Sequence, residues 1–288
     1  MGKFSVLAVV GGDERQLYTS EKFSKMGYEV RQFGISGHKR GEENIEDVLR
    51  EANYVLLPVP VTKDGYRLNS EKEILLSEMV KMIPKNSVVF AGKLPPFFKD
   101  HLRNERIRFY DYYEDQDFLW ENADITAEAG VSVIMNEATA ALKELKILIC
   151  GFGRIGKLLA KKLADLGADI TVAARKKENL MEAEFFLGAK TDSINYARKG
   201  VFELSRKYDF IINTIPSWIF DEDNASLLVD TVYVELASSP FGGEQSFMKK
   251  NCGKYILASG LPGKYAPNTA ANAVFDFMLG FVEGEEMI

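Results

Sequence analysis

The sequence contains few cysteines and few histidines, and their scarcity excludes several kinds of site. Its 288 residues include two cysteines, Cys150 and Cys252, and two histidines, His38 and His101. Two cysteines are too few for a disulfide framework or a cysteine-ligated cluster, so we expect both to be small buried side chains. Because no HExxH or comparable His/Cys spacing occurs, no metal site is predicted.

Positive charge and long apolar runs are also lacking. The chain has 36 Lys and Arg against 42 Asp and Glu, a net charge of −6, and no long basic run, so nucleic acid is not an expected partner. No apolar stretch approaches the roughly 18 to 20 residues of a membrane span, and Gly11-Gly12 comes too early for a signal peptide. We therefore expect a cytoplasmic protein without a membrane partner.

What is present is ordinary globular composition, with 46% apolar and 27% charged residues. The length predicts two domains with substantial cores. Short apolar runs alternate with amphipathic stretches, which is typical of α/β winding. Strands are predicted at 4–10, 28–33, 54–60, 87–92 and 107–113, then at 145–150, 168–174, 208–214, 231–237 and 254–259. Helices are predicted at 13–26, 45–51, 70–82, 155–166 and 268–282.

Between 122 and 145 the sequence becomes rich in Ala, Glu and small apolar residues at helical spacing, with Thr126 as a predicted N-cap. We place the domain boundary on this helix, giving domains 1–125 and 126–288. The predicted fold class is two Rossmann-like or flavodoxin-like, doubly wound parallel-sheet domains joined by a linker helix. The C-terminal helix is long enough to return to the first domain.

A glycine-rich loop follows the apolar strand that begins the second domain. Gly151, Gly153 and Gly156 form G-x-G-x-x-G, directly after a strand and opening an amphipathic helix. In that setting the glycines allow a tight turn, close approach of a diphosphate and close packing of helix on strand. A vestigial loop and an S-adenosyl ligand are the alternatives. The predicted cofactor contacts here are Gly151, Phe152, Gly153, Arg154, Ile155 and Gly156.

The end of the next strand indicates which dinucleotide is bound. An Asp or Glu that accepts hydrogen bonds from the adenosine ribose usually stands there. Here Ala174 is followed by Arg175 and Lys176, and a guanidinium can bind a 2'-phosphate that a carboxylate would repel. The residues Ala174, Arg175 and Lys176 thus favour NADP over NAD. A solvated basic cluster at the start of a surface helix is the alternative.

Two later loops lie where strand carboxyl ends meet the ligand crevice of such a fold. From them we select Thr214, Ile215, Pro216 and Ala237 as candidate contacts for the nicotinamide ribose and ring. Ordinary turn chemistry of proline and glycine is the alternative explanation of both loops. The second domain, 126–288, is therefore predicted to be the NAD(P)-binding one.

Candidate substrate residues come from loops of other strands. The segment 259–269 presents Lys264 from a stiff, tightly turned backbone, which suits a carboxylate ligand, with an exposed lysine in a surface turn as the alternative. Asn268 or Thr269 is the candidate cap of the last helix. Gly11 to Arg15 can form an anion-accepting helix start. The first domain, 1–125, is therefore the substrate-side domain. The predicted substrate contacts are Gly11, Gly12, Asp13, Arg15, Pro58, Lys93, Gly260, Lys264 and Asn268.

Four motifs, together with the pair Ala174-Arg175 after the second strand of this domain, resemble the A-type subunits of the dipicolinate synthase family. They are GFGRIG at 151–156, INTIPSWIF at 212–220, ELASSPFGG at 235–243 and ASGLPGKYAPNTAA at 258–271. The resemblance implies an oxidoreductase of spore formers, acting on a CH-CH or CH-NH donor. With a separate, flavoprotein-like B-type subunit it would oxidise dihydrodipicolinate to dipicolinate during sporulation, on a branch from lysine and diaminopimelate biosynthesis. A homo-oligomer is also expected.

Aromatisation of the ring supplies driving force, so the protein must chiefly position and desolvate the substrate. Lys264 and the turn at Gly11 to Arg15 are candidate holders of the two carboxylates, and Lys264 and Asp13 are the candidate catalytic residues. Asp13 is the candidate base for the departing proton, with solvent or the B-type subunit as alternatives.

Two other classes of function fit parts of this sequence. D-2-hydroxy acid dehydrogenases share the two-domain plan but use a histidine beyond the cofactor loop, and here no histidine follows His101. A non-catalytic NADP-binding partner or sensor, with the chemistry in the B-type subunit, remains the alternative because no acid/base pair is evident.

Overall fold

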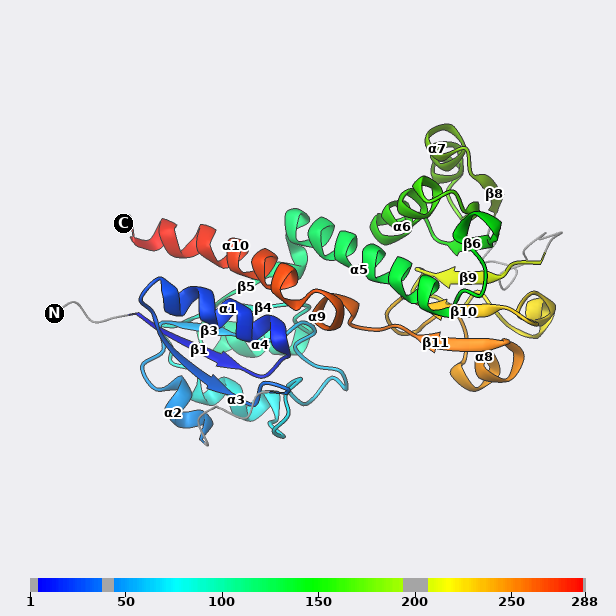
Figure 1. Ribbon diagram of the computed structural model, residues 1–288. Coiled ribbons are helices and arrows are strands. Elements are labelled where there is room, and N and C mark those ends of the chain that lie inside the picture. The colour runs from blue at the N-terminus through cyan, green and yellow to red at the C-terminus, as the bar shows by residue number, and fades with distance from the viewer. Residues whose placement is uncertain (1–4, 38–43, 194–206, 287–288) are drawn as a thin grey trace. The chain divides into compact units, whose positions relative to one another are not determined.

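The computed structural model describes residues 5–37, 44–193 and 207–286, so that His38 lies outside the described part (Figure 1). The chain divides into two compact units, which we call the first unit, Met1–Asn122 with Pro262–Ile288, and the second unit, Ala123–Leu261. The predicted second domain, 126–288, therefore extended too far at its C-terminal end. Across the described residues, no helix combines the length and the apolar character needed to cross a bilayer.

The first unit contains a five-stranded parallel sheet in the order β2-β1-β3-β4-β5. This flavodoxin-like order places a switch point between β1 and β3, where connections leave toward opposite faces. Its strands are β1 (Val6–Val10), β2 (Glu29–Phe33), β3 (Tyr54–Leu56), β4 (Val88–Ala91) and β5 (Arg108–Asp111). Its helices are α1 (Glu14–Lys25), α2 (Ile45–Leu49), α3 (Leu76–Met82), α4 (Pro96–Asn104) and α10 (Pro267–Glu286).

Side chains on β1 alternate between two cores. Val6, Ala8 and Val10 pack with α2, α3 and α4, whereas Leu7 and Val9 pack with α1 and α10. Both faces are therefore covered, as parallel sheets require. Figure 1 shows α10 lying along α1, the return of the chain that the fold prediction anticipated.

The second unit has a six-stranded parallel sheet in the order β11-β10-β9-β6-β7-β8. Counted within the unit this is 6-5-4-1-2-3, the dinucleotide-binding order, with its switch point between β6 and β9. The strands are β6 (Lys146–Cys150), β7 (Asp169–Ala174), β8 (Lys190–Ser193), β9 (Phe210–Asn213), β10 (Val232–Glu235) and β11 (Lys254–Leu257). Five strands were predicted here, and β8 was missed.

The remaining helices include α5 (Gln116–Glu137), which carries the chain from the first unit into the second. The others are α6 (Arg154–Asp165), α7 (Lys177–Leu187), α8 (Gln245–Asn251), α9 (Leu261–Tyr265) and the short 3-10 helices η1 (Tyr112–Glu114), η2 (Leu142–Glu144) and η4 (Glu222–Leu227).

The two cysteines differ: Cys150 is buried, while Cys252 is half-buried and burial raises the pKa of its thiol to about 12. Neither thiol is therefore set up to react at neutral pH.

Candidate functional site

The glycine-rich loop of the second unit lies at the switch point of its sheet. Gly151 follows β6 with φ of +101°, and its N–H donates to the Ala173 carbonyl at 2.7 Å. The loop after β9 is bonded to the same place, because the N–H and Oγ1 of Thr214 both donate to the Cys150 carbonyl at 2.9 Å. The two loops that leave the switch point are thus fixed to one another.

The three glycines of this loop have different roles. A Cβ at Gly156 would lie 2.2 Å from the Gly151 carbonyl oxygen, so only glycine lets α6 approach β6 this closely. A Cβ at Gly153, in contrast, would meet nothing within 4 Å. The protein itself does not require glycine there, and the open space beside Gly153 fits the approach of a ligand diphosphate.

The start of α6 is suited to an anion. Gly153 caps the helix without any side-chain hydrogen bond, so no side chain competes for its first N–H groups. The following helix, α7, also lacks a side-chain hydrogen bond at its N-cap residue, Lys176. Lys157 on α6 is paired with Glu182 on α7 at 2.6 Å, so its charge is already balanced.

A pocket opens at this switch point. It is lined by Gly151, Phe152, Gly153, Ala174, Arg175, Lys176, Asn179, Thr214, Ile215 and Pro216. Nine of these are predicted cofactor contacts, and Asn179, on the first turn of α7, was missed. Arg154, Ile155 and Gly156 lie in the first turn of α6 rather than in the lining, and Ala237 is buried.

Glu235, which the sequence analysis did not select, holds the loop that contains Ala237. Its carboxylate is fully buried at the end of β10 and accepts four hydrogen bonds. The donors are Asn213 Nδ2 and Ala237 N to Oε1, and Tyr233 Oη and Gly242 N to Oε2, at 2.8 to 3.0 Å. Burial raises the pKa of Glu235, while these bonds favour its ionised form. The sequence does carry a signal for Glu235 and its neighbour Asn213. Each is the polar last residue of an otherwise apolar strand, VYVE or FIIN, and the two strands are adjacent.

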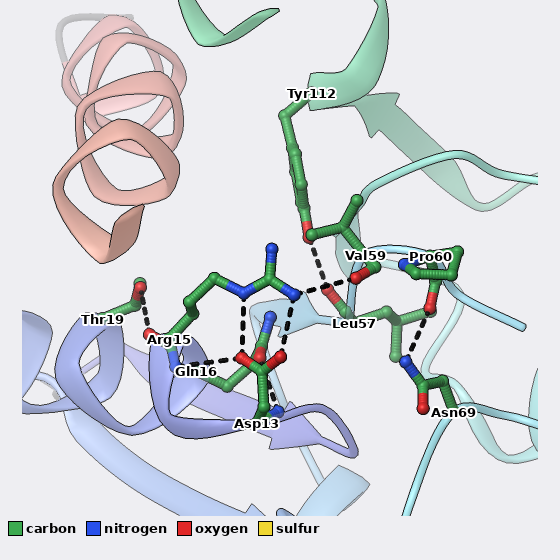
Figure 2. Close-up of polar contacts among 9 residues, drawn as sticks. All are labelled: Asp13, Arg15, Gln16, Thr19, Leu57, Val59, Pro60, Asn69 and Tyr112. Atoms are coloured by element: carbon green, nitrogen blue, oxygen red, sulfur yellow. Dashed lines mark hydrogen bonds and ion pairs between the residues drawn. The ribbon is translucent and has the colours of Figure 1, made fainter. Parts of the chain in front are cut away.

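The switch point of the first unit carries a second polar cluster (Figure 2). Arg15 is 6% exposed and donates from Nε and Nη2 to the two carboxylate oxygens of Asp13, at 2.9 and 2.8 Å. Its Nη2 also donates to the Val59 carbonyl at 3.0 Å, which connects the loops after β1 and β3. Nη1 is the guanidinium nitrogen that takes no part in these three bonds.

The pair changes the chemistry expected of Asp13. Burial opposes ionisation of its carboxyl, but the hydrogen bonds and charge of Arg15 outweigh it, and the pKa of Asp13 lies below its ordinary value. A carboxylate held in this way is a weaker base than a free one. Tyr112, fully buried nearby, donates to the Leu57 carbonyl at 3.1 Å, and burial raises its pKa.

The backbone of the predicted anion-accepting turn is already bonded. The N–H groups of Gly11 and Gly12 donate to the carbonyls of Phe33 and Asn69, both at 2.8 Å. The Asp13 N–H donates to Gln16 Oε1, and the Arg15 N–H donates to Asp13 Oδ1. These four N–H groups could donate to a substrate carboxylate only by giving up bonds that form the turn, so the predicted role of this backbone would require the turn to rearrange.

The segment around Lys264 approaches this cluster from the other end of the sequence. A Cβ at Gly263 would lie 2.6 Å from Asp13 Oδ2 and 2.8 Å from Arg15 Nε, so the two segments are in close contact within the first unit. Lys264 is exposed on α9, a short helix where a tight turn was predicted. The structure thus brings together Asp13, Arg15 and the Lys264 segment.

The other predicted substrate residues are placed differently. Lys93 is exposed with φ of +61°, and its N–H donates to the buried Asp111 carboxylate at 2.8 Å. Pro58 is buried, and its carbonyl accepts from Gly92 at 3.2 Å. Asn268 is exposed in the first turn of α10, not a cap, because that helix begins at Pro267. Gly260 belongs to the second unit.

Comparison with known proteins agrees with the motifs. Residues 6–113 match the family model for the N-terminal domain of the dipicolinate synthase A-type subunit. The corresponding dipicolinate synthase subunit of Bacillus subtilis strain 168 is 25% identical over 97% of each chain. The resemblance inferred from the sequence is therefore confirmed.

Solved structures support the fold in the same way. The crystal structure of the dipicolinate synthase A-type subunit from Bacillus halodurans has a TM-score of 0.80 and 25% identity, over 96% of this chain and 97% of that one. A transhydrogenase from Sinorhizobium meliloti has a TM-score of 0.62 with 14% identity, over 97% and 93%, which shows a shared fold alone. Two doubly wound parallel-sheet domains are therefore established for this chain.

Proposed function

We propose that this chain, whose N-terminal domain belongs to the family of dipicolinate synthase A-type subunits, oxidises dihydrodipicolinate to dipicolinate with NADP as the hydride acceptor. One observation carries the cofactor part of the proposal. The glycine-rich loop and the cations Arg175 and Lys176 line one pocket at the switch point of the second unit. That is where a dinucleotide with a 2'-phosphate needs a diphosphate cradle and a cation.

The chemistry asked of the chain is modest. The substrate loses one hydride and one proton, and its ring becomes aromatic. When bound, the nicotinamide supplies the acceptor for the hydride. The first turn of α6 and Arg175 would hold the diphosphate and 2'-phosphate ends, and Thr214, Ile215 and Pro216 would border the nicotinamide half.

Substrate carboxylates would be held by cations of the first unit. Lys264 is exposed on α9, next to Gly263, which contacts the Asp13–Arg15 pair. Arg15 Nη1, which takes no part in the bonds to Asp13 and Val59, would be the guanidinium nitrogen that binds a substrate carboxylate. Lys93 is held in place through its backbone by Asp111. Asp13 remains the candidate base, although its pairing with Arg15 favours solvent or a partner as the proton acceptor.

The naming of the relatives as one subunit of a synthase supports a second, B-type subunit as partner. We further propose that the complex works in the cytoplasm of sporulating cells and that this chain forms a homo-oligomer. The alternative is a non-catalytic NADP-binding protein, with the chemistry in the B-type subunit. Two observations make a direct test of this alternative worthwhile. The N–H groups of Gly11 and Gly12 already have backbone partners, and Asp13 is already paired with Arg15.

Titration calorimetry with NADP+ and NAD+ tests the cofactor assignment. We expect tighter binding of NADP+, and we expect Arg175→Ala to weaken NADP+ binding by about tenfold while hardly changing NAD+ binding, since only NADP+ carries the 2'-phosphate. Lys249→Ala, an exposed cation on α8, is the matched control. Failure of the unaltered protein to bind either nucleotide would contradict the proposal.

Turnover separates the two functions. The purified chain is mixed with dihydrodipicolinate and NADP+, and the absorbance of reduced nicotinamide is followed with and without the B-type subunit. Turnover by the chain alone supports the proposed activity. Nucleotide binding without turnover, restored only when the B-type subunit is added, would support the non-catalytic alternative.

A further inference from the structure

The Glu235 carboxylate stands between the two loops that border the nicotinamide half of the proposed cofactor site. Glu235 ends β10 and pairs in register with Asn213, which ends the neighbouring β9. Both side chains are fully buried, at 0% exposure. An ionised carboxylate can only accept hydrogen bonds, and all four that Glu235 accepts come from these two strands and the loops that follow them.

On one side, hydrogen bonds of Asn213 connect the Glu235 carboxylate to the pocket lining. Asn213 Nδ2 donates to Glu235 Oε1 at 2.8 Å and to the Ile215 carbonyl at 2.9 Å. Its Oδ1 accepts from the Ile215 N–H at 3.0 Å. The carboxylate fixes the orientation of the amide, and the amide holds both backbone groups of Ile215, a residue of the pocket wall.

On the other side, the carboxylate closes the loop that follows β10. The N–H groups of Ala237 and Gly242 donate to Oε1 and Oε2, at 3.0 and 2.8 Å. The Gly242 carbonyl accepts from the N–H groups of Ile219 and Phe220, at 2.7 and 2.9 Å, in the loop 214–220 that follows β9. The indole of Trp218 adds a bond from Nε1 to the Pro240 carbonyl at 3.1 Å.

We propose that Glu235 is a positioning residue for cofactor binding: through Asn213 and Gly242 its buried carboxylate sets the shape of the loops 214–220 and 236–242. This inference rests on the proposed function, because it assigns the shaped loops to nucleotide binding. A carboxylate is needed rather than an amide, because a glutamine has one accepting oxygen and would turn its own N–H groups toward donors.

Nucleotide affinity, compared with stability, tests the proposal. Glu235→Gln and Asn213→Ala are each titrated with NADP+ in the full chain, and each is expected to weaken binding by about tenfold, as for a disturbed charge-assisted hydrogen bond. The matched control is Thr231→Val. Thr231 is buried directly before β10, at the end of the strand opposite to Glu235, and its Oγ1 donates to the Tyr208 carbonyl at 3.0 Å. This variant should lower thermal stability but keep NADP+ affinity within about twofold.

A second readout follows the loops themselves. With Trp120 replaced by Phe, Trp218 is the remaining tryptophan of the chain. Its emission should shift in Glu235→Gln and stay unchanged in Thr231→Val.

The outcomes are distinct. Wild-type affinity in both Glu235→Gln and Asn213→Ala, or an equal loss in Thr231→Val, would overturn the positioning role while the proposed function stands. If Glu235→Gln does not fold, the affinity of Asn213→Ala decides. Absence of nucleotide binding by the unaltered chain would remove the proposed function and this inference together.

Discussion

At the scale of single residues, buried carboxylates organise the loops at the ends of both sheets. Glu235 does so in the second unit, and Asp111 does so in the first, where it accepts from the N–H groups of Lys93, Leu94 and Tyr113. Each carboxylate supplies the hydrogen bonds that the buried N–H groups would otherwise make to water. These residues shape loops whose chemistry is carried by other side chains.

The Asp13–Arg15 pair makes stability depend on pH. The pKa of Asp13 is lowered in the folded protein from an ordinary value of 3.8. Its stabilising effect is therefore complete above that value and is lost as the pH falls through the lower, folded pKa. We expect Asp13→Asn, which keeps a capping side chain, to lower the free energy of unfolding at neutral pH and to flatten its fall as the pH drops below the ordinary value of 3.8.

Asp13→Asn leaves the Arg15 guanidinium in a buried site without its charged partner, which is the physical reason for the loss at neutral pH. Urea denaturation at a series of pH values measures it. Asp100→Asn breaks an exposed ion pair with Arg103 and serves as the control, for which little change is expected. A pH profile of Asp13→Asn parallel to that of the wild type would contradict the prediction.

At the scale of elements, the sequence predicted strands better than helix ends. Buried strands such as β1 and β6 appear as continuous apolar runs. Strand β8, KTDS, is polar and carries no such signal, and among the described residues it pairs with β7 alone. The linker helix begins at Gln116, where Asp115 Oδ1 accepts from the Phe118 N–H, so Thr126 lies inside it and is not the cap. Composition located the helix, but a single capping hydrogen bond set its start.

Helix α3 shows the same limit. It was predicted from residue 70, but it begins at Leu76 because Ser70 Oγ donates to the Gly34 carbonyl and accepts from the Lys72 N–H. Such local side-chain bonds compete with helix formation.

The candidate site could be predicted in part. Nine pocket residues follow from strand ends and glycine spacing, whereas Asn179, Glu235 and the pairing of Asp13 with Arg15 depend on packing that spacing does not reveal.

Two glycines of the same loop should respond in opposite ways to alanine. Gly156→Ala places Cβ against the Gly151 carbonyl, so we expect the free energy of unfolding of the second unit to fall by about 1–3 kcal/mol. Gly153→Ala has open space and an ordinary φ of −82°, so stability should change by less than about 1 kcal/mol. Its Cβ nevertheless occupies the approach to the loop, and NADP+ affinity should fall at least tenfold.

Thermal unfolding and calorimetry on both variants measure this contrast. Full NADP+ affinity in Gly153→Ala would show that no diphosphate approaches the loop there, and unchanged stability in Gly156→Ala would contradict the packing argument.

At the scale of the whole molecule, the first unit is completed only when the end of the chain returns to it. On α10, Phe275 meets Phe23 of α1 at 5.0 Å between ring centroids, and Phe281 meets Tyr110 of β5 at 4.0 Å. The helix period and length predicted this return. The predicted domain range counted α10 with the second domain because sequence order does not show which core a terminal helix joins.

The return predicts that a substitution near the C-terminus destabilises the N-terminal unit. Met278 is fully buried in the core that also contains Leu7 and Val9, so Met278→Ala should lower the free energy of unfolding of the first unit by about 2–4 kcal/mol. The chain has two tryptophans, Trp120 in the first unit and Trp218 in the second, so W218F and W120F backgrounds report each unit separately. In urea, the Trp120 transition should move to lower concentration, while the Trp218 transition and NADP+ affinity stay unchanged. Asp276→Ala, exposed on the same helix, should move neither transition, and an equal shift of both transitions in Met278→Ala would show that the two units unfold as one.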